Sequence, residues 1–571
     1  MTDVPADPYA ADSAPSFWQR HADRLAAAGV FVATVVLTVL MFPPWRTPEF
    51  AYLFAVPAVF WAYRRPGWRL YAGTVLGAGA VAWTILLGWL HHVTWGGLLA
   101  LGPFVGVWVG SWFLAARWAM PRMLGRSHLT RVLVVLGLAG LWVVIEWTRQ
   151  WFLSGFPWLP LAASQWQRVT VLQVASITGE GGVSFVLMAM NLGFAAYAHR
   201  LLCEGRALLA GETDAPERGV RIGFAKRSQE FMVAVFLLLV CIALHVQAVS
   251  GRGRFARPAG VFAIVQPDIA QSVKWDPAEG PAILEVLATE TLRAAESRPD
   301  VLLWPEATTP WAAIGDDWMR SWVGELATRA GRPLVLGSIV IEQEGRPEEA
   351  WFNGVLAADP GEGVRAEFYA KRKLVPFGEY VPLRSSLLGW LDKVVPVGGD
   401  FRQGAEAAPI TVPTADGGEL RLGALVCYED VFGWPARESV RAGADILSVH
   451  TNGGWFGRGG AAEQHAAHSV LRAVETRRPV LRTGNAGWSG WIDEFGSIRA
   501  VVTRQPDGSV STDPAREDAG TVYFRGSATV PVSVDARWVG AQSFYVRHGD
   551  WFVAVAAGLA LAGWRALRRG R

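Results

Sequence analysis

The sequence predicts a protein of two parts, an α-helical membrane domain of about eight spans and an α/β domain outside the cytoplasm. Hydrophobic residues make up 51% of the 571 residues and charged residues 18%, below the roughly 25% charge of soluble chains. Long apolar runs crowd the first 250 residues, and another lies close to the C-terminus. Between them, residues 257–535 alternate short aliphatic runs with amphipathic stretches, a pattern that indicates alternating strands and helices.

Most of the apolar runs approach the ~20 residues that a helix needs to cross a bilayer. The run at 49–63 is the shortest and is the weakest prediction. The predicted spans are 28–44, 49–63, 70–91, 97–118, 132–148, 171–198, 231–249 and 551–566.

The distribution of Lys and Arg predicts how these spans are oriented, because short cytoplasmic loops carry an excess of basic residues. With a cytoplasmic N-terminal segment 1–27, nineteen basic residues fall on the inner side and three in the outer loops. Seven spans within 28–249 then place residues 257–535 outside the cytoplasm. The last span, 551–566, returns the basic tail 567–571 to the inside.

The loop 149–158, between the fifth and sixth predicted spans, is rich in aromatic residues and contains Gly155 and Pro157 as helix breakers. It is predicted to lie at the membrane interface, either as part of an aromatic belt or as a contact for a lipid substrate. Glu146 lies close to a predicted span end, where a solvated or salt-bridged carboxylate is expected.

The charge and metal signals exclude several classes of function. A net charge of +3 does not indicate a nucleic-acid partner. No metal or cofactor site is predicted: His465 and His468 are three residues apart in a helical pattern, but no third ligand is evident. Cys427 is the only cysteine between residues 257 and 535, so it is a candidate for thiol chemistry.

Polar residues follow several predicted strands, where α/β folds place their chemistry. Trp304-Pro-Glu306 ends one apolar run, Cys427-Tyr-Glu429 ends another, and Lys371 and Glu379 share a loop rich in Pro and Gly. Each of these residues alone is more often structural. Together they form an acyl-transfer apparatus of a nucleophilic thiol, a carboxylate base and a cation for the oxyanion.

These segments resemble the Glu-Lys-Cys triad of the nitrilase, or carbon–nitrogen hydrolase, superfamily, which implies an α-β-β-α sandwich. The resemblance narrows to the apolipoprotein N-acyltransferase family at Gln271-Ser-Val-Lys-Trp275, Trp351-Phe-Asn353, Thr451-Asn-Gly-Gly-Trp455 and the membrane loop Ser154-Gly-Phe-Pro-Trp158. One departure is Gly453, where the family commonly has Asp.

The resemblance implies a bacterial inner-membrane enzyme that needs no cofactor. It would move an acyl chain from a phospholipid, typically phosphatidylethanolamine, onto the cysteine as a thioester. The acyl group would then pass to the α-amino group of a diacylglyceryl-cysteine on an apolipoprotein. The implied roles are Glu306 as base, Lys371 as oxyanion donor, Cys427 as nucleophile, Glu379 as the carboxylate orienting the lysine, Tyr428 and Glu429 as pocket-shaping residues, and Trp275, Asn353 and Trp455 as lining or gating residues.

Three alternatives remain from the sequence. A membrane-tethered amidase or nitrilase would use the same triad with water as the acceptor. A transporter or receptor is disfavoured because few charges lie within the spans. A scaffolding homologue without activity is disfavoured because all three triad positions are filled.

Overall fold

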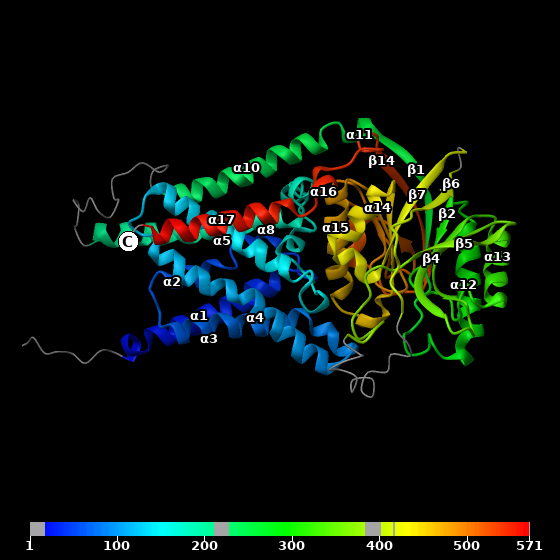
Figure 1. Cartoon of the computed structure of the whole chain (residues 1–571), viewed down its shortest axis with the longest axis horizontal. Helices are drawn as coiled ribbons and strands as arrows, with labels where there is room; N and C mark the ends of the chain where they lie inside the picture. The colour runs from blue at the N-terminus through cyan, green and yellow to red at the C-terminus, as the bar shows by residue number, and fades with distance from the viewer. Residues whose placement is uncertain (1–16, 210–227, 383–400, 415–416, 570–571) are drawn as a thin grey trace, which may run out of the picture.

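The computed structural model describes residues 17–209, 228–382, 401–414 and 417–569. The predicted terminal segments 1–27 and 567–571 therefore lie partly outside the described residues. The molecule is elongated, with a bundle of long helices at one end and a layered α/β domain at the other (Figure 1).

Seven helices in the described part of the chain are long and apolar enough to cross a membrane. Six precede the α/β domain and one follows it. Their bounds are α1 Phe17–Leu40, α3 Trp68–Leu86, α4 Trp95–Ala119, α5 His128–Thr148, α8 Glu180–Leu209, α10 Gln229–Val249 and α17 Trp551–Arg568. Shorter helical pieces in the same domain are η1 Pro48–Tyr52, α2 Val56–Ala62, η2 Gly88–His92, η3 Met120–Arg122, η4 Phe152–Ser154, η5 Leu161–Gln165, α6 Val169–Leu172 and α7 Ala175–Thr178.

The structure differs from the expected eight spans at two places. The run 49–63 forms η1 and α2, which together are too short to cross a bilayer as one straight helix. The run 171–198 is divided, because Gly179 adopts a φ of 70° between α7 and the start of α8. Periodicity alone does not reveal this break, since the residues on both sides are apolar.

Small residues allow the membrane helices to pack closely. Gly79 on α3 and Gly106 on α4 face each other, so that a Cβ on either would clash with the backbone of the other. Gly140 on α5 meets the backbone of Ala556 on α17 in the same way. Close backbone approach at small residues is a main source of helix association in lipid, and here it joins the last helix of the chain to the N-terminal bundle.

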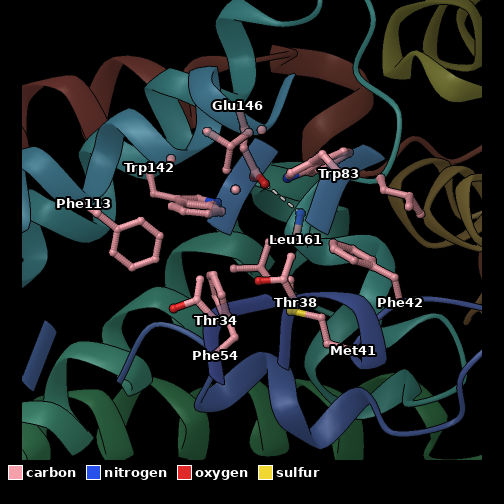
Figure 2. Close-up of a pocket in the computed structure, with 15 residues that line it drawn as sticks. Thr34, Thr38, Met41, Phe42, Phe54, Trp83, Phe113, Trp142, Glu146 and Leu161 are labelled. Atoms are coloured by element: carbon pink, nitrogen blue, oxygen red, sulfur yellow. Dashed lines mark hydrogen bonds between the residues drawn. The ribbon is translucent and has the colours of Figure 1, made fainter. Parts of the chain in front are cut away.

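A small apolar cavity lies among α1, α3, α4 and α5, and Glu146 points into it (Figure 2). The Glu146 carboxylate is buried and accepts a hydrogen bond of 2.7 Å from the backbone N–H of Leu161. The sequence predicts a solvated or salt-bridged carboxylate here. In the structure it is buried and hydrogen-bonded to the backbone instead. It holds the start of η5 and thereby the end of the membrane loop.

In the described residues of the α/β domain, the strands form two six-stranded sheets and a separate pair. The first has the order β14-β1-β2-β3-β4-β5 and the second β11-β10-β9-β8-β7-β6. The strands of the first sheet are β1 Ala256–Gln266, β2 Val301–Leu303, β3 Leu334–Glu342, β4 Ala350–Asp359, β5 Gly363–Ala370 and β14 Gly526–Asp535. Those of the second are β6 Ile410–Pro413, β7 Glu419–Val426, β8 Ile446–Thr451, β9 Val480–Gly484, β10 Gly490–Ile492 and β11 Ile498–Val501; β12 Thr503–Arg504 and β13 Val510–Ser511 form a separate pair.

Helices cover the outer face of each sheet, which gives the expected α-β-β-α order (Figure 1). The helices α12 Gly280–Ala295 and α13 Asp317–Ala330 lie far from the membrane bundle, whereas α14 Gly433–Arg441 and α15 Ala461–Thr476 lie between the second sheet and the bundle. Between the sheets, alternate apolar residues such as Phe262 and Leu422 form one buried core, as period-2 strands require.

The chain enters and leaves the α/β domain on neighbouring strands. The short helix α11 Arg252–Phe255 links α10 to β1, and α16 Phe544–His548 precedes α17 after β14. Because β1 and β14 pair antiparallel along Ala256–Gln266, both covalent connections to the membrane domain lie side by side.

Candidate active site

The three predicted triad residues follow strands of both sheets and converge at one place. Glu306 comes three residues after β2, Lys371 directly follows β5, and Cys427 directly follows β7. The lysine Nζ lies 3.3 Å from Glu306 Oε1. The exposed fractions of Glu306, Lys371 and Cys427 are 7%, 1% and 7%, so the site is largely shielded from water.

The backbone holds Cys427 in an unusual conformation. Its φ is 48°, a left-handed value that residues other than Gly, Asn and Asp rarely adopt. The strand β7 ends here and the short helical turn Cys427–Val431 begins. The Thr451 hydroxyl, at the end of β8, donates a 3.3 Å hydrogen bond to the sulfur. Strain of this kind is found at positions that must present a reacting atom.

Two carboxylates flank the lysine. Its Nζ lies 2.9 Å from Glu379 Oε1 as well as 3.3 Å from Glu306. The Asn353 side-chain amide donates 2.8 Å hydrogen bonds to both carboxylates. One lysine and one amide thus hold two negative groups in fixed positions on either side of the Lys371 ammonium.

Backbone N–H groups donate hydrogen bonds to the second oxygen of each carboxylate. The N–H of Asn452 donates to Glu306 Oε2 at 3.0 Å, and the N–H of Val375 donates to Glu379 Oε2 at 2.8 Å. Charge-assisted bonds of this type stabilise the ionised form of a carboxyl group.

The electrostatic environment fixes the protonation states of the three groups. Burial acts to raise the pKa of Glu306, but Lys371 and Asn353 outweigh it and hold the pKa below its ordinary value. Burial acts to lower the pKa of Lys371, but its two carboxylates raise it above the ordinary value. Burial, followed by the Glu306 charge, raises the pKa of the Cys427 thiol to about 12. At neutral pH the site therefore holds a thiol, a carboxylate and an ammonium group.

This arrangement can carry out base-assisted thiol attack. A neutral thiol beside an ionised carboxylate transfers its proton as the sulfur bonds to an acyl carbon. A fixed cation in a water-poor site stabilises the oxygen that becomes negative in the same step.

The other predicted site residues have different surroundings. Asn353 is buried between the two carboxylates, as described above. Trp275 and Trp455 are 50% and 44% exposed, so their rings are open to solvent. Tyr428 is buried and its hydroxyl donates a 3.0 Å bond to the Gly155 carbonyl of the membrane loop. Glu429 is fully buried.

Glu429 joins the loop that carries Lys371 to the loop that carries Cys427. Its carboxylate accepts bonds of 2.7 and 3.1 Å from the backbone N–H groups of Arg372 and Lys373, and one of 2.7 Å from Val426 N–H. The Tyr369 hydroxyl donates to it at 2.8 Å. These bonds fix the position of the Lys371 loop relative to the Cys427 turn, and the pocket-shaping role of Glu429 stays a prediction.

The membrane loop 149–158 contacts the α/β domain directly beside the site. In addition to the Tyr428 contact, the Lys373 ammonium donates a 2.5 Å bond to the Ser154 carbonyl. The Trp158 indole donates to the Gln464 side chain at 2.9 Å. The loop thus binds residues that follow both Cys427 and Lys371 in the chain.

His465 and His468 lie on α15 behind the nucleophile. His465 Nε2 is 2.7 Å from Asp430 Oδ1 and 3.2 Å from the Cys427 carbonyl oxygen. His468 Nε2 accepts a 3.3 Å bond from the Leu159 N–H. Within the described residues, no group of three or more His, Cys, Asp and Glu side chains is arranged to hold a metal ion.

Three residues at the site, Lys274, Thr451 and Asn452, stand in motifs quoted from the sequence but received no role there. Lys274 is buried and its Nζ donates a 3.1 Å bond to the backbone carbonyl of Glu306. The sequence features that could have indicated these residues are a lysine next to Trp275 and a Thr-Asn pair directly after an apolar run. Gly453 packs against the Ala486 carbonyl with no room for a Cβ, so an acid at this position would require the backbone to move.

Comparisons with known proteins match both parts of the chain. Residues 35–193 match the model of the apolipoprotein N-acyltransferase N-terminal domain, and residues 262–529 match that of carbon-nitrogen hydrolase. Among solved structures, an amidase from Nesterenkonia sp. has 18% identity and a TM-score of 0.35, covering 52% of this chain and 96% of its own.

Named relatives extend over both domains. Apolipoprotein N-acyltransferase from Geobacter metallireducens is 32% identical over 438 residues, which cover 75% of this chain and 73% of that protein. The enzymes of the same name from Pseudomonas syringae pv. tomato and Pseudomonas aeruginosa are each 30% identical, covering 76% and 70% of this chain and 79% and 71% of their own. The chain belongs to the apolipoprotein N-acyltransferase family.

Proposed function

We propose that this protein is an N-acyltransferase that transfers an acyl chain from a membrane phospholipid to the N-terminus of a lipoprotein. Cys427 carries the acyl group as a thioester between the two steps. Family membership, the Glu306–Lys371–Cys427 geometry and the attachment of the domain to membrane helices support this function.

In the first step, Glu306 takes the proton of the Cys427 thiol as the sulfur attacks the ester carbonyl of the phospholipid. Lys371 stabilises the negative oxygen of the tetrahedral intermediate. When the C–O ester bond breaks, Glu306 returns the proton to the departing glycerol oxygen. A lysophospholipid leaves, and the acyl group remains on the sulfur.

In the second step, the α-amino group of an S-diacylglyceryl-cysteine attacks the thioester. Glu306 accepts the proton that the nitrogen loses and passes it to the sulfur as the C–S bond breaks, which forms the amide and restores both the Cys427 thiol and the Glu306 carboxylate. The low exposure of all three triad residues favours the amine over water, since few water molecules reach the thioester.

The remaining predicted residues have supporting roles in this proposal. Glu379 and Asn353 orient Lys371 and Glu306 through the bonds described above. Tyr428 connects the nucleophile to the membrane loop. Trp275 and Trp455, with their exposed rings, line the entrance and contact the apolar parts of the substrates.

The proposed orientation follows the positive-inside rule. Segment 1–27 and tail 567–571 are cytoplasmic, and the catalytic domain 257–535 is periplasmic. The helices within 28–249 and 551–566 span the inner membrane, and η1 and α2 together return the chain across it as one broken crossing between α1 and α3 (Figure 1). Phosphatidylethanolamine is the proposed donor and a diacylated apolipoprotein the acceptor.

The observation that carries the proposal is the hydrogen bond from Tyr428 to Gly155. Tyr428 directly follows the nucleophile, and Gly155 lies in a loop that extends from a membrane helix. The loop also exposes Trp151 and Leu153 beside the site. A soluble amide substrate gives no physical reason for such a contact, whereas a lipid acyl chain must reach the thiol from this side.

The test is the intact mass of purified protein after incubation with phosphatidylethanolamine, with peptide mapping around residue 427. We expect one added acyl mass that hydroxylamine releases and that a diacylated lipopeptide removes as an N-acyl product. Loss of the thioester only to water would instead assign the hydrolase alternative. The absence of any adduct on a folded protein would refute the thioester route.

A further inference from the structure

A second buried lysine lies beside the triad. Lys274 follows β1 in the segment that leads to α12, and its side chain is 2% exposed. Its Nζ donates a 3.1 Å hydrogen bond to the Glu306 carbonyl oxygen and lies 5.6 Å from the Trp275 ring centre. In the part of the chain that the structure describes, this is the one hydrogen bond of its ammonium group.

The segment that carries Lys274 is attached to the site at a second point. The Gln271 side-chain oxygen accepts a 2.8 Å bond from the Asn452 amide, and the backbone N–H of Asn452 donates to the Glu306 carboxylate. Lys274 and Asn452 therefore hold Glu306 from two sides, one through its main chain and the other through its side chain.

The charges of the cluster require a second cation. Glu306 and Glu379 are both within 3.3 Å of Lys371, so these three groups together have one excess negative charge. Formation of a thiolate or an oxyanion beside an excess negative charge is opposed by Coulomb repulsion, which is strong at a buried site. With Lys274 protonated, the four groups are neutral in total.

The titratable groups around Lys274 and Glu306 agree with this balance. Burial lowers the pKa of Lys274 to about 8, and the Glu306 and Cys427 charges act in the opposite direction, so the ammonium form predominates at neutral pH. Burial lowers the pKa of His450, whose ring is bonded to the Trp304 carbonyl, to about 4, so this imidazole adds no charge.

The choice of residue type is also informative. Of the 53 basic residues in the sequence, five are lysines and the others are arginines. Two of the five are buried at this site. A lysine presents a compact point charge on a flexible stem, whereas an arginine presents a wide planar group with five donors. A position that needs one cation in a small buried space therefore favours lysine.

We propose that Lys274 is a positioning residue for Glu306, fixing its main chain and keeping its carboxylate ionised until Cys427 gives up its proton. The inference rests on the proposed roles of Glu306 and Cys427, but not on the identity of the acyl donor or acceptor. In the proton-transfer step, the thiol hydrogen moves to the carboxylate and the sulfur electron pair forms the new bond. The total charge of the cluster stays at zero when Lys274 is present and at −1 when it is absent.

The experiment measures alkylation of Cys427 by iodoacetamide from below pH 3 up to pH 8, so that the range includes the acid limb of Glu306, in full-length protein with the exposed Cys203 replaced by Ser. In this reaction the sulfur–carbon bond forms, iodide leaves, and the thiol proton passes to Glu306. Peptide mapping assigns the product to residue 427. The variants are Lys274→Met, which keeps the length of the stem without charge, and Lys274→Arg, which keeps the charge.

We expect the acid limb of the pH–rate profile to move upward by about one pH unit in Lys274→Met, which is about a tenfold slower reaction at the lower end of the range. The sign follows because loss of a cation makes ionisation of Glu306 less favourable. Lys274→Arg should return the limb toward the wild-type position. Lys373→Met is the control, because its ammonium donates to the Ser154 carbonyl and its loss should leave the midpoint unchanged.

An unchanged midpoint in folded Lys274→Met would overturn the proposal, even if the plateau rate falls, because a purely structural role lowers the rate without moving the pH dependence. If Lys274→Met does not fold, Lys274→Gln is compared with Lys274→Arg. An equal displacement of the acid-limb midpoint in these two variants would also overturn the proposal. Alkylation needs no lipid. A displaced limb combined with no acyl transfer would support the role of Lys274 and reject the proposed acyltransferase.

Discussion

Replacing Gln464 with leucine would remove the hydrogen bonds that join α15 to four points of the membrane domain. Its side-chain oxygen accepts from the indoles of Trp89 and Trp158 at 3.2 and 2.9 Å. Its side-chain nitrogen donates to the carbonyls of Pro43 and Leu86 at 3.2 and 3.0 Å. Gln464 is buried, and leucine has a similar volume, so the change affects polar contacts more than packing.

The expected loss follows from the four bonds. A neutral hydrogen bond contributes about 0.5–1.5 kcal/mol net, which gives about 2–6 kcal/mol for four. Unfolding entropy is roughly 2.1 cal/mol/K per residue, so for 571 residues this loss lowers the thermal midpoint by about 2–5 °C. Buried partners left unpaired place the effect toward the upper end.

The assay is thermal unfolding in detergent, followed by tryptophan fluorescence, together with protease sensitivity of the segments that link the two domains. We expect Gln464→Leu to unfold earlier and to be cleaved faster at residues 250–256. Gln403→Leu, at an exposed glutamine, is the control. A Gln464→Leu midpoint within 1 °C of wild type would refute the reasoning, because it would mean that these bonds contribute nothing to the domain interface.

Three further predictions concern the site and its support. Cys427→Ser should fold but acquire no hydroxylamine-labile acyl group when incubated with phospholipid, as judged by intact mass; a labile adduct would place the thioester elsewhere. Glu306→Gln and Lys371→Met should each slow acylation by at least ~10²-fold, measured by quenched-flow mass spectrometry, and near-normal rates would remove that residue from the mechanism. Burial opposes ionisation of Asp430, but its contacts with the His465 imidazole and the Arg482 guanidinium outweigh burial and hold its pKa below the ordinary range. It therefore adds stability that is present above about pH 4 and is lost as pH falls further. Asp430→Asn should be less stable than wild type at pH 7, and a constant difference in thermal midpoint down to pH 2 would contradict this account.

Much of the fold could be predicted because apolar runs and strand alternation are local properties of the sequence. The long membrane helices and the alternating strands and helices of the α/β domain follow from them, whereas the α-β-β-α order is what the resemblance to the nitrilase superfamily implies. Two apolar runs do not form single helices, and hydropathy does not predict the local breaks within them. Gly179 interrupts a continuous apolar run through its backbone conformation, and the run at 49–63 is divided into two short helices.

The site was only partly predictable, because chain adjacency does not determine side-chain direction at a turn. Tyr428 and Glu429 both follow the nucleophile in the sequence. The turn at Cys427 directs the tyrosine toward the membrane loop and the glutamate into the interior. Lys274 reaches Glu306 across thirty-two positions, a pairing that depends on how β1 and β2 align and that no local pattern reveals.

The pairing of β1 with β14 has a mechanical consequence. Both covalent links to the bundle leave from adjacent strands, so on their own they attach the domain to the bundle at one side. The contacts of Gln464, Tyr428 and Lys373 with the membrane segments attach it at further points. With these contacts formed, the Cys427 thiol is held at a fixed distance from the membrane helices. In the proposed reaction both substrates must extend their reacting atoms over that distance, so the length of chain that separates a lipid anchor from its reactive group becomes a criterion of selection.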